Sequence, residues 1–342
     1  MLAPSTFEQI APDPILSDFD LPLRATLYPL GFPLRLVTNS MDVIQAAHQA
    51  WGAFSQAFDS PPMRLSLGVV DSESSRLPSR SKFRSREHLM SIILDVENFV
   101  MCDFNQGQAF GWVTRNVAAD HALLRYRLLS EAVLCMAEQQ SLAPLHGALV
   151  AKNGCGVAFF GESHAGKSTL SYACARAGWN YISDDGIFLV RDRFDRYAIG
   201  DPYTVRFRDD AKRLFPELSD RLAVARPNGK MGMEIFTKEL PLTPALGSTI
   251  DQMVFLNRHH TGPAHLRPYP QDKAQSFFEA FVTYGASHVR AAQVRSYERL
   301  ADVPVWELCY RNVKDAMEIL EKLVDRARPV TNTATHSTRQ LL

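Results

Sequence analysis

The segment "LHGALVAKNGCGVAFFGESHAGKSTLSYACARAGWNYISDD", residues 145–185, decides the fold of the second half of this 342-residue chain. Two short apolar runs, "ALV" and "GVAFF", have the character of strands and precede a glycine-containing loop. A helical pattern over 167–177 follows the loop and ends at Gly178. A further strand is predicted over 180–191, "NYISDDGIFLVR", and it carries two adjacent aspartates. This strand–loop–helix–strand order predicts a mixed α/β domain.

The loop at 161–168, "GESHAGKS", fits the phosphate-loop pattern G-x-x-x-x-G-K-[ST]. The torsions open to glycine let successive backbone N–H groups point at phosphate oxygens, and the following helix adds its positive dipole end. We expect Lys167 to contact the β- and γ-phosphates and Ser168 to ligate Mg²⁺. The predicted nucleotide site consists of Gly161, Glu162, Ser163, His164, Ala165, Gly166, Lys167, Ser168 and Thr169.

The competing interpretation of this loop is an ordinary glycine turn into a helix. A chain of this length matches the pattern by accident roughly one time in a hundred, and the flanking strand and helix favour phosphate binding further. Glu162 and His164 occupy variable positions of the pattern, where solvated side chains are expected. Thr169 is expected to pack at the start of the helix.

The adjacent acids Asp184 and Asp185 lie 17 and 18 residues after Lys167. Neighbouring residues of a regular strand point to opposite faces, so the pair is expected at a strand end or bulge, or with divided roles. In phosphoryl transfer, one carboxylate accepts the proton of the attacking hydroxyl and another supports the metal. The alternative is a solvated turn, "SDDG", which is common turn chemistry.

His146 and two later basic segments are further candidates. A lone histidine in an apolar stretch is more often a core residue, but His146 precedes Gly147 and lies one strand before the loop. The segment "YTVRFRDD" offers Arg206 and Arg208, and "RPNGKMG" offers Arg226 and Lys230. A cation that neutralises the transferring phosphoryl group is a standard need. Arg206 and Lys230 are favoured as phosphate or acceptor contacts because neither is expected on a helix face; the alternative is an exposed base.

Bulk composition bounds the class of protein. The chain is 46% hydrophobic and 22% charged, and its 37 basic and 37 acidic residues leave no formal net charge. These values predict a soluble globular protein and argue against a dedicated nucleic-acid binder. No apolar run approaches the length of a membrane span, and the N-terminus lacks the pattern of a secretory signal. A cytoplasmic location is therefore expected, and five scattered cysteines without a C-x-x-C pair fit reduced thiols.

The pattern of elements predicts three regions. Residues 1–130 contain several strand-like runs and an amphipathic helix at 40–58, which indicates a smaller α+β N-terminal domain for acceptor binding or regulation. A strong helix is expected over 120–140. Residues 131–328 form the predicted catalytic domain, and the polar tail 329–342 is expected to be disordered.

The motifs "LHGALV", "GVAFFGESHAGKS" and "YISDD" resemble the catalytic domain of bacterial HPr kinase/phosphorylase and its relatives. The resemblance covers about residues 145–325, and "LADVPVWELCYRNVKDAMEIL" is similar to the closing strand and helix of that domain. It implies a mixed-sheet P-loop kinase domain with a phosphoenolpyruvate-carboxykinase-like nucleotide fold. It also implies ATP with Mg²⁺ as donor and a serine hydroxyl as acceptor.

The same resemblance implies roles for individual residues. By this similarity, Asp184 would be the general base that takes the serine proton, and Asp185 would ligate the metal or support Asp184. His146 would orient the two acids. Lys167 and Ser168 hold phosphate and Mg²⁺. The Glu-Ile-Arg-Gly run of the family is missing, since "MEIF" at 233–236 keeps only Glu-Ile. That departure argues against phosphorolysis, and the unfamiliar residues 1–140 argue against HPr itself as the partner.

The leading functional hypothesis is an ATP-dependent kinase that phosphorylates a hydroxyl, foremost a serine of a protein or peptide. One alternative is a kinase for a small molecule such as serine, a sugar or a glycan precursor. Another is a nucleotide-binding regulatory module without catalysis, for which a general base has no use. Neither a membrane nor a nucleic acid is expected as a partner, and self-association is left open.

Overall fold

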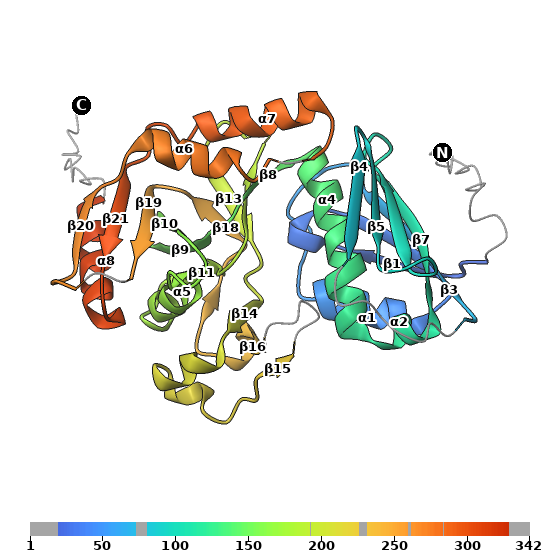
Figure 1. Cartoon of the computed structure of the whole chain (residues 1–342), viewed down its shortest axis with the longest axis horizontal. Helices are drawn as coiled ribbons and strands as arrows, with labels where there is room; N and C mark the ends of the chain where they lie inside the picture. Colours follow the sequence, from blue (N-terminus) through green and yellow to red (C-terminus); the bar gives the residue numbers. More distant parts are fainter. Residues whose placement is uncertain are drawn as a thin grey trace, which may run out of the picture. The chain divides into compact units, whose positions relative to one another are not determined.

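The computed structural model describes residues 20–72, 81–191, 193–225, 231–258, 261–282 and 284–327. The chain forms two compact units (Figure 1), each built from three segments. The first unit comprises Met1–Ala143, Pro216–Met233 and Val282–Val294, and the second comprises Pro144–Phe215, Glu234–Phe281 and Arg295–Leu342. The sequence-based division at 130/131 therefore differs from the structure, because two late segments join the first unit. The tail at 329–342 lies outside the described residues.

The first unit is organised around a seven-stranded sheet with the order β1-β2-β3-β7-β6-β5-β4. Strands β2, β3 and β7 are parallel to one another, and the remaining pairs are antiparallel. The strands are β1 Leu23–Leu27, β2 Leu34–Thr38, β3 Met63–Val70, β4 Lys82–Arg86, β5 Leu89–Ile93, β6 Phe99–Asp103 and β7 Gln108–Thr114.

The helices of the first unit begin and end where local chemistry requires. Helix α1, Met41–Trp51, begins at Ser40, whose side chain accepts a hydrogen bond from the Asp42 N–H. It is shorter than the helix predicted over 40–58, because the chain leaves the helix at Gly52. The helix predicted over 120–140 is present, with a π-helical turn at its centre. Its parts are α3 His121–Leu124, η2 Arg125–Leu129 and α4 Ser130–Gln140, preceded by α2 Arg115–Ala119.

A desolvated acid in the first unit is expected to make stability depend on pH. Glu138 of α4 accepts a hydrogen bond from the Tyr284 hydroxyl, and burial of its carboxyl end raises its pKa from 4.5 to about 7. Because the folded-state pKa is above the unfolded value, protonation stabilises the fold below pH 4.5, and this contribution is lost as pH rises through 7. We expect the free energy of unfolding, measured with denaturant, to be lower at pH 8 than at pH 5.5 by on the order of 1–2 kcal/mol because of this group.

The matched test is Glu138→Gln, which keeps a hydrogen-bond acceptor for Tyr284 without the titrating proton. The free energy of unfolding of this variant is expected to depend less on pH, whereas Glu318→Gln, at an exposed position of α8, Val313–Ala327, leaves the pH dependence unchanged. An unaltered slope in Glu138→Gln would assign the pH dependence to other groups.

The second unit contains a seven-stranded mixed sheet with the order β17-β11-β9-β10-β19-β21-β20. Strands β10, β19 and β21 are parallel, and β9 is antiparallel to both of its neighbours, β10 and β11. The strands are β9 Ala148–Lys152, β10 Cys155–Phe160, β11 Asn180–Ser183, β17 Thr243–Pro244, β19 Gln252–Asn257, β20 His265–Pro268 and β21 Val305–Cys309. The mixed α/β fold predicted from the strand–loop–helix–strand order is thus confirmed.

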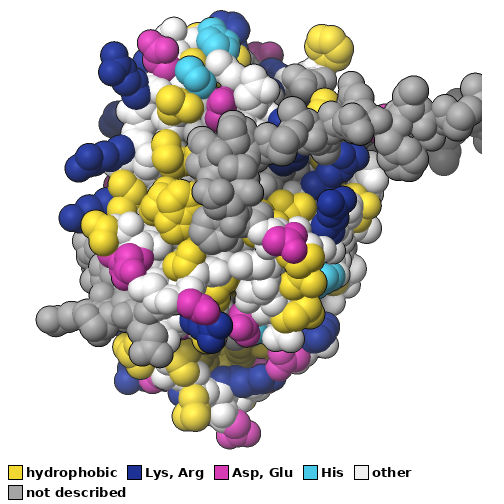
Figure 2. Space-filling model, turned by 90° about the vertical axis from the view of Figure 1, so that its right-hand side faces the viewer, with side chains coloured by type: hydrophobic (Ala, Val, Ile, Leu, Met, Phe, Trp, Pro, Cys, Tyr) yellow, Lys and Arg dark blue, Asp and Glu magenta, His cyan; other side chains and the backbone are white. Residues whose placement is uncertain are grey.

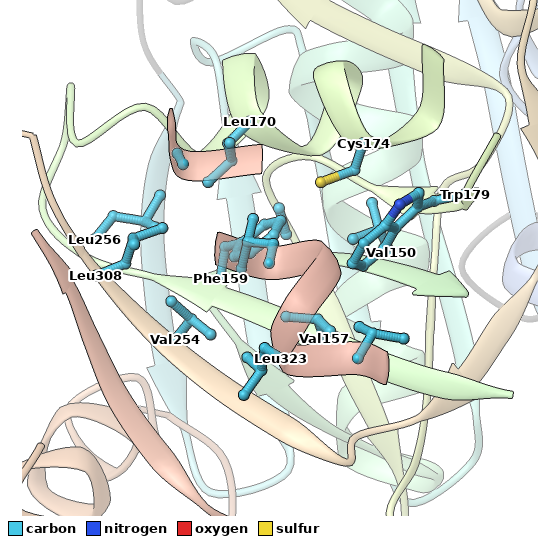
Figure 3. Packing of buried hydrophobic residues seen from close by; sticks show 14 of the residues in the cluster. Val150, Val157, Phe159, Leu170, Cys174, Trp179, Val254, Leu256, Leu308 and Leu323 are labelled. Carbon is cyan, nitrogen blue, oxygen red and sulfur yellow. The ribbon is translucent and has the colours of Figure 1, made fainter. Parts of the chain in front are cut away.

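Alternating side chains of β10 tie helices to both faces of this sheet. Phe159 belongs to a core cluster with Leu170 and Cys174 of α5, Lys167–Arg176, and Leu323 of α8, Val313–Ala327 (Figure 3). Phe160 points to the other face, where its ring lies 4.9 Å from that of Phe278 in α6, Gln271–Glu279. Since all of these side chains are buried, the strand that leads into the phosphate loop is held from both sides.

Two smaller sheets complete the chain, with the orders β18-β13-β12-β8 and β14-β16-β15. The single strand predicted over 180–191 is wrong in one respect. It breaks at the two acids, and β11 and β12 belong to different sheets. The break is stabilised by Ser183, whose hydroxyl donates to the carbonyl of Gly186 at 2.7 Å. The remaining α-helix is α7 Ser287–Glu298, and the remaining strands are β8 Leu142–Leu145, β12 Ile187–Val190, β13 Tyr197–Gly200, β14 Thr204–Phe207, β15 Val224–Ala225, β16 Met231–Phe236 and β18 Gly247–Thr249.

The surface carries charges of both signs. Basic and acidic side chains are interspersed on the face seen in Figure 2. Within the described ranges, no helix combines the length and apolar character needed to cross a membrane.

Candidate functional site

The direction of the strands brings three sequence motifs to one edge of the mixed sheet. Strand β10 ends immediately before Gly161, and β11 ends immediately before Asp184. Both strands are antiparallel to β9, so β10 and β11 run in the same direction and end at the same edge. His146 precedes β9, which starts at that edge. Ligands of open α/β sheets bind outside the carboxyl ends of parallel strands, which is where this cluster lies.

The loop at 161–168, the predicted phosphate loop, has left-handed torsions of the kind that a phosphate cradle needs. Gly161 and Gly166 have φ values of 137° and 102°, and His164 has a φ of 73°, all in the left-handed region. The Lys167 ammonium donates hydrogen bonds to the carbonyls of Gly161 at 2.8 Å and Glu162 at 3.3 Å. Burial lowers the pKa of Lys167, although the charges of Asp185 and Glu162 oppose that shift. The loop therefore wraps around its own lysine.

Tyr310 fixes the loop from a distant part of the chain, and no sequence pattern pointed to it. It follows β21, is 1% exposed, and its hydroxyl donates to the carbonyl of Ala165 at 2.9 Å. A Cβ at Gly166 would lie 2.3 Å from that hydroxyl oxygen. Only a residue without a side chain fits here. Tyr310 lies 143 residues beyond Lys167, and no local pattern links the two positions.

Gly166→Ala is expected to weaken nucleotide binding about tenfold or more, because the new methyl group forces apart the loop and Tyr310 at a strained φ. Gly178→Ala is the matched control. Its φ of 87° is also left-handed, but a Cβ there would meet no atom within 4 Å. Both variants pay for backbone strain, and only the first displaces the loop. Equal nucleotide affinities in the two variants, measured by titration calorimetry, would contradict the close contact.

Asp184 is directed into the protein beside the loop helix. It is 1% exposed, and its Oδ2 accepts a hydrogen bond from the Arg206 backbone N–H at 3.2 Å. The hydroxyl of Ser168 lies 3.4 Å from the Asp184 backbone carbonyl. Burial raises the pKa of Asp184 from 3.8 to about 6, against the opposing charge of Arg206, and Asp185 adds to the rise. Asp184 is therefore a desolvated carboxylate next to the serine of the phosphate loop.

Asp185 points the other way. Its side chain is 60% exposed, and its Oδ1 lies 3.8 Å from Nδ1 of His146, which is itself 42% exposed. The His146 ring also faces Phe281, with 5.6 Å between ring centroids. Gly147 lets this segment approach the sheet, since a Cβ there would lie 2.7 Å from the Phe160 ring. The two acids thus diverge at a strand end, which is one of the arrangements predicted from the sequence.

Two arginines on the segment that bonds Asp184 have side-chain partners of their own. The Arg206 guanidinium is directed at Glu234 of β16, with 3.4 Å between Nε and Oε2. Glu234 is the acid of "MEIF", and the structure places it near the site although sequence reasoning gave it no role. Arg208 contacts the loop itself: a guanidinium nitrogen lies 2.8 Å from Nδ1 of His164. Lys230, the other predicted cation, lies outside the described residues.

The residues beside the loop fit Mg²⁺ held mainly by phosphate. Among the described residues, no group of three or more His, Cys, Asp or Glu side chains is arranged as a metal site. Mg²⁺ prefers oxygen ligands and commonly takes one or two from protein and the rest from water and substrate phosphates. The Ser168 hydroxyl and the buried Asp184 carboxylate provide such oxygens. A dication there would also offset the desolvation that raises the Asp184 pKa.

Mg²⁺ binding with nucleotide is expected to weaken as pH falls through about 6, the Asp184 pKa, because a proton then competes with the cation. Affinity at pH 5 is expected to be roughly tenfold below that at pH 7. Asp184→Asn removes this competition, so any pH dependence it retains belongs to the nucleotide. If the affinity for Mg²⁺ with nucleotide depends on pH equally in the wild type and in the variant, Asp184 does not lie next to the metal.

The comparisons with known proteins give distant structural similarity and no match in sequence. No protein-family model and no curated protein matches the chain. Among solved structures, the HPr(Ser) kinase/phosphatase from Coxiella burnetii matches with 14% identity and a TM-score of 0.30, covering 54% of this chain and 94% of that one.

Proposed function

We propose that this protein is an ATP-dependent kinase that transfers the γ-phosphoryl group to a hydroxyl, foremost a serine of a protein or peptide. The observation that carries the proposal is the divergence of two acids beside a phosphate loop. One acid is buried against the loop serine, and the other is exposed next to a histidine. A module that only binds nucleotide has no need for the second, exposed carboxylate.

The proposal divides the acids differently from the sequence-based expectation, which made Asp184 the general base. A base must reach the proton that it removes. Asp184 is 1% exposed and occupied by the Arg206 N–H, whereas Asp185 is open to an incoming hydroxyl. We assign proton acceptance to Asp185 and support of Ser168 and Mg²⁺ to Asp184.

The remaining residues position the donor. When bound, Mg²⁺ supplies positive charge to the β- and γ-phosphate oxygens. Lys167 gives up its contacts with the loop carbonyls in favour of phosphate oxygens, and the loop N–H groups hold the β-phosphate. His146 lies within reach of Asp185 and orients that carboxylate toward the acceptor. In-line attack then needs little covalent help from the protein.

A polypeptide acceptor is favoured by the openness of the acceptor side. Asp185 and His146 are 60% and 42% exposed, so a hydroxyl carried on a large molecule has access to them. A small-molecule kinase needs to enclose its acceptor, because most of the surface of a small ligand is buried in its site.

The test is incubation of the purified protein with Mg²⁺ and γ-labelled ATP in native lysate, followed by size separation and mass spectrometry. The expected result is label on a serine of a protein or peptide, present with the wild type and lost with Asp185→Asn. Label only in the low-molecular-weight fraction would instead establish a metabolite kinase. Normal ATP binding without transfer to any acceptor would leave a regulatory module.

A further inference from the structure

The geometry points to Arg208 as a second cation for the phosphate loop, one that contacts the terminal phosphoryl group of a bound nucleoside triphosphate. This inference rests on the proposed function, because it assigns a residue to the same site. Sequence reasoning favoured Arg206 and Lys230 for this task. Three observations on the segment after β14 favour Arg208 instead.

The first observation is that the segment is anchored to the loop helix α5. Phe207 is 2% exposed, and its ring lies 4.8 Å from that of Tyr172 in an edge-to-face contact. Phe215 contacts the same Tyr172 ring at 4.7 Å. Such buried aromatic pairs hold their backbones firmly. The position of Arg208, the residue after Phe207, is therefore fixed relative to the helix that starts at Lys167.

The second observation is that β14 is fixed on the side of the acids as well. The Arg206 N–H donates to Asp184, and the hydroxyl of Tyr181 donates to the carbonyl of Thr204 at 3.1 Å. Both bonds connect β14 to the strand end that carries Asp184. A one-residue slip of β14 would break them and would move Arg208 away from the loop.

The third observation concerns the partners of the cations in this segment. The Arg206 side chain is directed at Glu234, and Lys212 pairs with Asp209 at 2.6 Å. The Arg208 guanidinium instead lies 2.8 Å from Nδ1 of the His164 ring. A phosphate oxygen carries negative charge, so it is a stronger partner for arginine than a histidine ring nitrogen. Arg208 can therefore exchange His164 for phosphate at little cost.

The position of His164 places that exchange at the mouth of the cradle. It is the fourth residue of the loop and has a left-handed φ of 73°, so the chain turns there before entering α5. In the reaction, the acceptor oxygen bonds to the γ-phosphorus while the bond to the bridging oxygen of ADP breaks. The hydroxyl proton passes to Asp185. Arg208 donates hydrogen bonds to the γ-phosphoryl oxygens, where negative charge is concentrated.

The decisive measurement compares the affinities of Arg208→Ala for ADP and for a non-hydrolysable ATP analogue, both with Mg²⁺. We expect about a tenfold loss for the triphosphate and less than about a twofold loss for ADP. Arg208→Lys, which keeps the charge without the planar fork, is expected to fall between. Arg213→Ala, at an exposed position of the same segment, is the control and leaves both affinities unchanged.

His164→Ala distinguishes an Arg208 that binds phosphate from an Arg208–His164 contact that only stabilises the loop. If Arg208 acts on phosphate, His164→Ala keeps the preference for triphosphate, because the arginine is released and not lost. If the Arg208–His164 pair only braces the loop, both variants lower the affinities for ADP and for the triphosphate analogue equally, and the inference is wrong. These binding measurements do not depend on catalysis. A wild type that never transfers phosphate overturns the proposed function, whereas equal losses of affinity for ADP and for the analogue in Arg208→Ala overturn only this inference.

Discussion

Lys167→Ala is expected to lower phosphoryl transfer by about 10²–10³-fold, the usual effect of removing one donor to developing charge. Lys167 is the only residue of the loop pattern that brings a mobile positive charge to the phosphates. Its side chain is 7% exposed and already turned into the loop, so no reorganisation of the backbone precedes its contact with phosphate. The measurement is the initial rate of transfer at saturating acceptor, together with the affinity for ATP.

The control for this variant is Lys322→Ala, at an exposed position of α8, which is expected to retain the wild-type rate. Because Lys167 also bonds the carbonyls of Gly161 and Glu162, circular dichroism and the thermal midpoint need to be recorded for both variants. A folded Lys167→Ala protein with full turnover would remove the loop from the mechanism.

The second large effect separates the two acids. Asp185→Asn is expected to lower kcat by about 10²–10⁴-fold, the contribution of a general base, while the affinity for Mg²⁺ and ATP is kept. Asp184→Asn is expected to affect binding instead, by raising the concentration of Mg²⁺ needed for half-maximal nucleotide binding. The physical reason is that Asp185 is exposed to the acceptor and Asp184 is buried beside Ser168.

These two variants are matched in size and charge, so each is the control for the other. If Asp184→Asn loses turnover with normal Mg²⁺ dependence while Asp185→Asn stays active, the assignment made from the sequence is restored. If both retain turnover, neither carboxylate accepts the acceptor's proton.

Local sequence was sufficient for the features that neighbouring residues create. The loop, its flanking strand and α5 lie within residues 145–185, and their order follows from apolar runs, glycines and a helical pattern. The prediction that Asp184 and Asp185 sit at a strand end or bulge also followed from strand geometry, and the break after β11 confirms it. The end of the helix predicted over 40–58 was wrong, because the apolar pattern continues beyond Trp51, where α1 stops.

Tertiary structure decided the rest, because the deciding contacts join residues far apart in the chain. The Tyr310 hydroxyl lies against Gly166, and the Arg206 side chain pairs with Glu234. Phe207 packs on the Tyr172 ring of α5 and so holds the neighbouring Arg208 in place. Asp184 is buried and Asp185 is exposed, and this difference gives the two carboxylates different chemical roles. Because both residues are aspartates and adjacent in the chain, the sequence does not show which of them is buried. Late segments likewise joined the first unit. Periodicity reports which face of an element is apolar, and only packing determines what that face meets.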